Sequence, residues 1–146
     1  PIIAGNWKMN KSVAEAVKIV TSINRKLFDE KKVEIVVCPP FISLVTVQEL
    51  IIDSPVELGA QDLFWEEKGA YTGEISPIML KDIGCKYVII GHSERRKYFG
   101  ETNSTVNKKI LAALHAELNP IICVGETKEE REQGITEAII QKQITE

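Results

Sequence analysis

Five short apolar runs alternate with amphipathic stretches along the chain, and this alternation limits the available folds more than any other feature. The runs have the length of β-strands, and the stretches between them repeat apolar residues at helical spacing. Strands and helices that alternate in this way form βαβ units, with parallel strands and right-handed crossovers. An open doubly wound sheet and a piece of a closed barrel both fit this pattern. The expected strands cover residues 2–4, 35–38, 56–60, 87–90 and 121–124.

The stretches between the runs carry helix signals. The first helix, expected from Ser12 to about Phe28, opens with the capping-box pair Ser12 and Glu15. The second strand ends at Pro39 and Pro40, which neither a helix interior nor a central strand tolerates. A short helix is expected after Pro77. Further apolar stripes at helical spacing lie at Leu44, Val47, Leu50 and Ile51, at Val106, Ile110, Leu111 and Leu114, and, in a helix from about Glu129, at Ile135, Ile139 and Ile140.

Charge and hydropathy argue against several classes of partner. The formal net charge of -3, from 18 basic and 21 acidic residues, gives no reason to expect nucleic acid or an anionic membrane. No apolar run approaches the roughly 18 residues that a membrane-spanning helix needs. The chain starts in a strand without a charged and apolar leader, so we expect a cytoplasmic protein.

The sequence predicts neither a cofactor nor a metal. No G-x-G-x-x-G pattern or P-loop opens a helix, which argues against dinucleotide and nucleotide binding. The cysteines Cys38, Cys85 and Cys123 lack metal-ligand spacing. Each lies in or beside an apolar run, where a thiol packs as a small hydrophobic group. A small molecule is therefore the expected partner.

Polar segments follow four of the five strands. In parallel α/β proteins the residues that carry chemistry lie at these carboxyl ends. The fourth strand is a continuous apolar run, typical of burial on both faces, and it leads directly into a histidine, a serine and a glutamate. The four segments read GNWKMN at residues 5–10, AYTGE at 70–74, GHSERR at 91–96 and CVGET at 123–127.

Together and in this order, the four segments closely resemble triosephosphate isomerase, and the resemblance covers the whole chain from Pro1 to Glu146. It implies an α/β fold: a partial TIM (βα)8 barrel with about five parallel strands and flanking helices, in a single domain over residues 1–146. The family interconverts dihydroxyacetone phosphate and glyceraldehyde 3-phosphate in glycolysis and gluconeogenesis. Triose phosphate is therefore the expected substrate.

The resemblance also assigns site residues. His92 matches the family's electrophilic histidine, itself the standard example of an imidazole kept neutral by a helix N-terminus. The segment after His92 is expected to open such a helix. Lys8 and Asn6 match the substrate-polarising lysine and its companion asparagine, and Glu94 resembles the second carboxylate near that lysine. Thr72 resembles the tip of the loop that docks on a partner subunit.

The chain is expected to be truncated, because a complete barrel takes about 250 residues. The family's catalytic glutamate follows its sixth strand and its phosphate loops come later, whereas five strands are expected here. Glu126, at the end of the fifth strand, has no motif support as a replacement base. Loss of a positioned base removes roughly 10²–10⁴-fold in rate. We therefore expect very weak or no isomerase activity from the chain alone.

Two other interpretations remain open. The chain can be a non-catalytic module that assembles with itself or with a complementing chain, or an unrelated flavodoxin-like ligand-binding domain, which would not explain the four motifs. The open strand edges near Ile2, Ile3, Ile121 and Ile122 predict a homo-oligomer, because unpaired edges and large exposed apolar patches are rare in soluble monomers. The loop around Thr72 offers a second contact surface.

Overall fold

The computed structural model describes residues 1–27, 29 and 32–146. A single five-stranded parallel sheet forms its centre. The strands at residues 56–60 and 87–90 coincide with the sequence prediction, because each is rich in apolar residues and buried along most of its length. The strands are β1 (Ile2–Asn6), β2 (Glu34–Cys38), β3 (Val56–Ala60), β4 (Tyr87–Ile90) and β5 (Asn119–Ile122).

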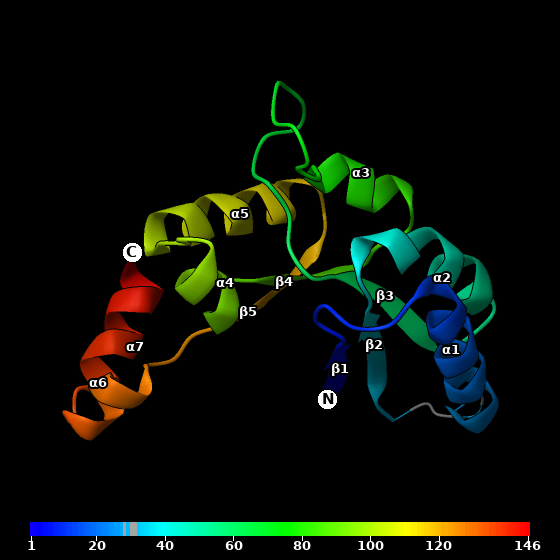
Figure 1. Ribbon diagram of the computed structural model, residues 1–146, viewed down its shortest axis with the longest axis horizontal. Coiled ribbons are helices and arrows are strands. Elements are labelled where there is room, and N and C mark those ends of the chain that lie inside the picture. The colour runs from blue at the N-terminus through cyan, green and yellow to red at the C-terminus, as the bar shows by residue number, and fades with distance from the viewer. Residues whose placement is uncertain (28, 30–31) are drawn as a thin grey trace.

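The strands follow one another across the sheet in sequence order, and each pairs in parallel with the next. The sheet curls into half of a barrel, with helices flanking it (Figure 1). A doubly wound flavodoxin-like sheet would instead reverse its strand order at a switch point. The predicted partial TIM barrel is therefore confirmed, and the flavodoxin-like interpretation is wrong.

Local signals start and stop the helices. Glu15 and Ser12 form the predicted capping box before α1, with the Ser12 backbone N–H donating to Glu15 Oε2 at 2.9 Å. Phe28, the predicted end of that helix, lies outside the described residues. The helices are α1 (Val13–Leu27), α2 (Leu44–Ile51), α3 (Pro77–Asp82), α4 (Ser93–Tyr98), α5 (Asn103–His115), α6 (Lys128–Glu132) and α7 (Thr136–Thr145), with a 3-10 turn η1 (Phe41–Ser43) before α2.

Two predicted elements need correction. The fifth strand covers Asn119–Ile122 rather than residues 121–124. It begins earlier because the Asn119 N–H donates to Lys86 O at 2.9 Å, and its pairing with β4 ends where Ile122 meets Ile90. Pro120 is tolerated there since β5 is an edge strand. The single helix expected from about Glu129 is two helices. Gly134 separates them with a φ of 71°, a left-handed conformation that ends a helix.

Side chains alternate between the two faces of the sheet. Val37, Leu58 and Val88 point to the main core, where they meet residues of α1, α2, α3 and α5. Val36 and Cys38 point to the opposite face, the inside of the half-barrel, in a smaller cluster with Tyr87 and Ile89. Thus one face of the sheet is covered by helices and the other faces the barrel interior.

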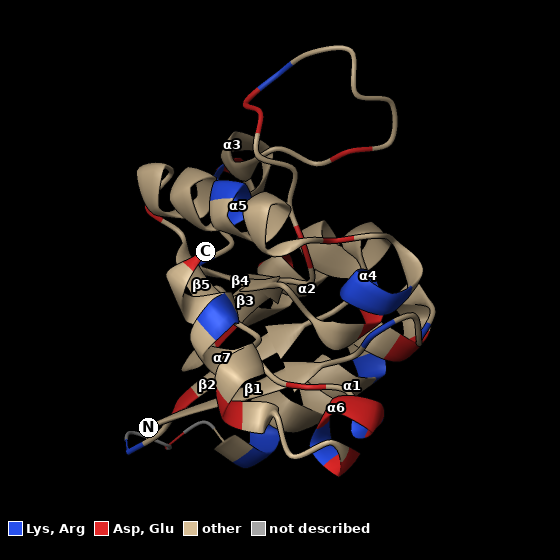
Figure 2. Cartoon of the chain, turned by 90° about the vertical axis from the view of Figure 1, so that its left-hand side faces the viewer, with Lys and Arg blue, Asp and Glu red and all other residues tan. Residues whose placement is uncertain are grey.

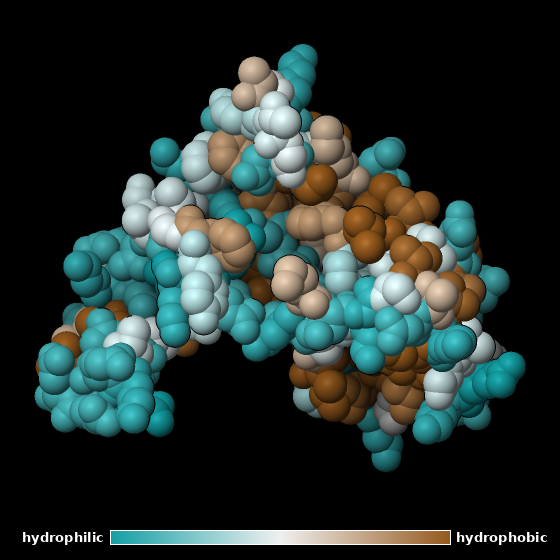
Figure 3. Space-filling view, viewed as in Figure 1, coloured by the Kyte–Doolittle hydropathy of each residue, from teal (hydrophilic) through white to brown (hydrophobic). Residues whose placement is uncertain are grey.

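The edges of the sheet carry exposed apolar residues. On β1, Ile2 and Ile3 are 52% and 64% exposed, and on β5 Ile122 is 47% exposed. Figure 3 shows apolar surface in the region of β1. The face in Figure 2 carries charges of both signs, interspersed over the helices. No helix within the described residues is long and apolar enough to cross a membrane.

Candidate active site

The candidate site lies where β1 and β4 end. Parallel strands bring their carboxyl ends to one edge of a sheet, so Asn6 at the end of β1 and His92 just beyond β4 line the same cavity of about 260 Å³. Lys8 and Glu94 line it as well. Lys8 and His92 therefore lie near one another at the carboxyl edge of the sheet, as expected for residues that follow parallel strands.

Glu94 contacts both Lys8 and His92 in the cavity. Its Oε1 accepts a hydrogen bond from Lys8 Nζ at 2.7 Å, and its Oε2 lies 3.5 Å from His92 Nδ1. The hydrogen bond from Lys8 is the main reason why the pKa of Glu94 lies below its usual range, and the charge of Lys8 adds to it. Glu94 is thus held as a carboxylate that fixes the lysine.

His92 caps the N-terminus of α4, as the sequence predicted. Its Nδ1 accepts a hydrogen bond from the Glu94 backbone N–H at 3.2 Å. A ring nitrogen that accepts a hydrogen bond carries no proton, so in the neutral imidazole the proton resides on Nε2. The ring can then donate from Nε2 to an acceptor in the cavity.

Asn6 and Lys8 belong to one tight turn after β1. The Asn6 side-chain Oδ1 accepts from the Lys8 backbone N–H at 2.9 Å. Lys8 has a φ of 54°, in the left-handed region that side chains other than glycine rarely adopt. The asparagine therefore shapes the turn that carries the lysine into the cavity.

A buried ion cluster borders the cavity, and the sequence did not predict it. Lys109 Nζ on α5 lies 2.7 and 2.8 Å from the two carboxylate oxygens of Asp62 and also pairs with Glu101. Arg95 Nε on α4 contacts the same two carboxylates, at 2.9 and 2.6 Å. One signal was available. Lys109 shares the buried stripe of α5 with Val106 and Ala113, a position where a lysine needs buried partners.

Burial and charge affect the two carboxylates of this cluster differently. Burial raises the pKa of Asp62 above its usual range, although Lys109 and Arg95 oppose it. Burial acts in the same direction on Glu101, but there the hydrogen bonds from Lys109 and Arg95 outweigh it and lower the pKa. Glu101 is therefore the carboxylate that stays charged most readily.

Two other predicted positions lie outside the cavity. Thr72 lies in the loop that projects between β3 and α3 (Figures 1 and 2), and it is exposed. The base of this loop is closed by a hydrogen bond of 2.9 Å from the Phe64 N–H to Ile75 O. Glu126 Oε1 accepts from Arg131 Nε at 2.7 Å, within its own segment. Glu126 is therefore engaged away from the candidate site.

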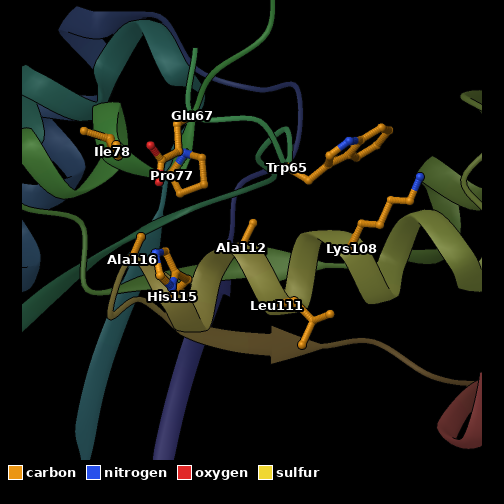
Figure 4. A pocket seen from close by; sticks show the side chains of 9 residues that line it. All are labelled: Trp65, Glu67, Pro77, Ile78, Lys108, Leu111, Ala112, His115 and Ala116. Carbon is orange, nitrogen blue, oxygen red and sulfur yellow. The ribbon is translucent and has the colours of Figure 1, made fainter.

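A second, larger groove of about 710 Å³ lies between α3 and α5 (Figure 4). Trp65 and Lys108 form one end of it, with the ammonium 5.2 Å from the indole ring, and His115 lies toward the other. None of the predicted site residues lines it. Within the described part of the chain, no three His, Cys, Asp or Glu side chains are grouped as metal ligands would be.

Comparison with known proteins agrees with this geometry. The family model described as triosephosphate isomerase matches residues 1–146. The triosephosphate isomerases of Thermoanaerobacter pseudethanolicus and Moorella thermoacetica are 58% and 57% identical to the chain over 146 residues, which is 100% of this chain and 58% of each relative. The chain thus spans somewhat over half the length of these relatives.

A solved structure is similar as well. The triosephosphate isomerase of Bartonella henselae superposes with a TM-score of 0.93 at 38% identity, over 99% of this chain and 60% of the other. The match of fold therefore extends over nearly all of the described sheet and helices. The chain belongs to the triosephosphate isomerase family.

Proposed function

We propose that this chain provides the carbonyl-polarising half of a triosephosphate isomerase site, with His92, Lys8 and Glu94 as catalytic residues and Asn6 and Lys8 as substrate-binding residues. Isomerisation moves a proton between adjacent carbons through an enediolate. It needs a carboxylate base, a donor to the substrate carbonyl and positive charge near the developing oxyanion. The proposal assigns the last two requirements to this chain.

The hydrogen bond from the Glu94 N–H to His92 Nδ1 carries the proposal. It leaves Nε2–H as the donor of a neutral ring, so His92 can polarise a carbonyl without first losing a proton. Lys8 provides the positive charge, and its ion pair with Glu94 keeps the ammonium in the cavity. Asn6 supports the same turn through its hydrogen bond to the Lys8 N–H.

The base is the requirement that these residues do not meet. The carboxylates that line the cavity are Asp62 and Glu94, and each already pairs with a cation. The family's base follows its sixth strand, whereas the described residues form five strands. We therefore infer that the chain alone isomerises triose phosphate very slowly or not at all. Without a positioned base, the rate falls by roughly 10²–10⁴-fold.

A second candidate function is assembly, favoured by the exposed apolar residues on the two edge strands. Homo-oligomers of this chain, or a complementing chain, would cover Ile2 and Ile3 on β1 and Ile122 on β5. Covering about 400 Å² of apolar surface contributes on the order of 10 kcal/mol before the costs of association. Light scattering tests this idea, and a monodisperse mass near 16.3 kDa would contradict it. A cytoplasmic location stays a prediction from the sequence.

A coupled assay for conversion of glyceraldehyde 3-phosphate separates the two functions. The chain is assayed alone and mixed with the segment of the Thermoanaerobacter pseudethanolicus enzyme that it does not span. We expect turnover in the mixture that falls by roughly 10²–10⁴-fold on His92→Gln. His115→Gln is the matched control, since His115 is exposed at the end of α5. Assembly without turnover would favour the module and overturn the isomerase proposal.

A further inference from the structure

The backbone of Lys8 is held in a conformation that costs free energy. A left-handed conformation is unfavourable for a residue with a side chain, and it persists only where the surroundings fix it. Hydrogen bonds fix this turn at successive backbone groups. The Trp7 N–H donates to Cys38 O at 3.1 Å, Trp7 O accepts from Asn10 Nδ2 at 2.9 Å, and the Lys8 N–H donates to Asn6.

Gln61 fixes the remaining group, the carbonyl of Lys8. It follows β3 directly, is partly buried, and lines the cavity. Its side-chain Nε2 donates to Lys8 O at 2.9 Å and to Cys38 O at 2.9 Å. The amide has two N–H groups, and both are used. Its orientation is determined as well, because the amide oxygen in that place would face two carbonyl oxygens.

We propose that Gln61 is a positioning residue of the site, which holds the strained backbone of Lys8 so that the lysine ammonium reaches Glu94. The inference rests on the proposed function for its link to catalysis. The path runs from the end of β3 through the Lys8 carbonyl to the contact of 2.7 Å between Lys8 Nζ and Glu94 Oε1.

The two carbonyl groups that accept from Gln61 are affected differently when its side-chain amide is removed. Cys38 O keeps the Trp7 N–H as a donor, so the end of β2 remains anchored. Lys8 O loses the donor that Gln61 supplies, and the left-handed turn loses one of its constraints. Relaxation of φ and ψ at Lys8 redirects its side chain, because both rotate the Cα–Cβ bond relative to the sheet. The lysine is therefore more sensitive to Gln61 than the strand is.

The pKa of Glu94 reports the position of Lys8, because the hydrogen bond from Lys8 lowers it. The pKa of Glu94 is measured by site-resolved carbon NMR in the unchanged chain and in Gln61→Met, which keeps the length of the side chain and removes both donors. Lys8→Met marks the full loss of the ion pair, and Gln133→Met, at the exposed C-cap of α6, is the control. His92 is the same in all four proteins, so its effect on Glu94 is common to them.

We expect the pKa of Glu94 to rise in Gln61→Met, in the direction of the value in Lys8→Met, and to stay unchanged in Gln133→Met. A folded Gln61→Met protein whose Glu94 titrates as in the unchanged chain would overturn the proposal, even if it melts at a lower temperature. No substrate enters this measurement. Its failure is therefore distinct from a failure of the isomerase assignment.

A second measurement does not depend on the folding of any variant. In the unchanged chain, both side-chain amide hydrogens of Gln61 are donors, so they should exchange with solvent more slowly than those of the exposed Gln133. Equal exchange rates for the two glutamines would show that the bridge to Lys8 does not persist, and would overturn the proposal as well.

Discussion

Replacement of Lys109 by methionine tests the buried ion cluster. Lys109 is only 4% exposed and pairs with both Asp62 and Glu101. Removing one partner of a buried ion pair costs about 3–5 kcal/mol, because a charge is left without compensation. Arg95 remains within 2.9 Å of both carboxylates, which favours the lower end, about 3 kcal/mol. At about 2–4 °C per kcal/mol for a chain of this size, the melting temperature falls by about 6–12 °C.

The assay is urea unfolding followed by circular dichroism, with Lys108→Met as the matched control. Lys108 neighbours Lys109 on α5, and among the described residues its ammonium makes a cation–π contact with Trp65 rather than an ion pair, so its loss should cost at most about 1 kcal/mol. Equal losses in the two variants would refute the reasoning.

The loss of unfolding free energy in Lys109→Met, the deficit of this variant, should also depend on pH. Lys109 lowers the pKa of both Asp62 and Glu101, so its removal raises both pKa values in the folded state. A carboxyl whose folded pKa exceeds its unfolded pKa takes up a proton preferentially in the folded state, which stabilises that state as the pH falls. The deficit should therefore shrink between neutral and acidic pH. A deficit that grows on acidification would contradict the assignment of uncompensated carboxylates.

Three further outcomes are expected. Burial raises the pKa of Cys38 and of Cys85 to about 12, so mass spectrometry after alkylation at pH 8 should find both unmodified in the native chain, with Cys123 reacting first. Modification of Cys38 before Cys123 would contradict this. Gly59→Ala places a Cβ 2.6 Å from Cys38 Sγ and should cost about 1–3 kcal/mol in urea unfolding. Thr102→Ala removes the capping box of α5 and should cost about 0.5–2 kcal/mol, and an unchanged unfolding midpoint would show that the cap is dispensable.

The fourth strand could be predicted from sequence because burial on both faces leaves an unbroken apolar run over Tyr87–Ile90. That reasoning fails at an edge. β5 extends back over Asn119 and Pro120, two residues that a central strand would exclude. Helical spacing of apolar residues likewise missed the break at Gly134, since the isoleucines that indicated the helix, Ile135, Ile139 and Ile140, all follow it.

The candidate site was predictable in part for a topological reason. Polar segments that follow parallel strands meet at one edge, so Asn6, Lys8 and His92 could be placed together before any geometry was known. Gln61 and Lys109 could not be placed beside their partners in this way. Their roles depend on contacts with Lys8 and Asp62, which lie 53 and 47 residues away in sequence, and only the curl of the sheet sets those distances.

Deuterium uptake into dihydroxyacetone phosphate in heavy water, followed by proton NMR, shows whether the residues of this chain can exchange a substrate proton without the family's base. We propose that His92 and Lys8 of this chain polarise the substrate and that the base belongs to the part of the relatives that the chain does not span. The account predicts exchange at the buffer background for the chain alone. It predicts clear exchange when the missing segment of a relative is added, lost again on His92→Gln. Exchange by the chain alone at the rate of the mixture would contradict the account, because one of its own carboxylates would then be acting as the base.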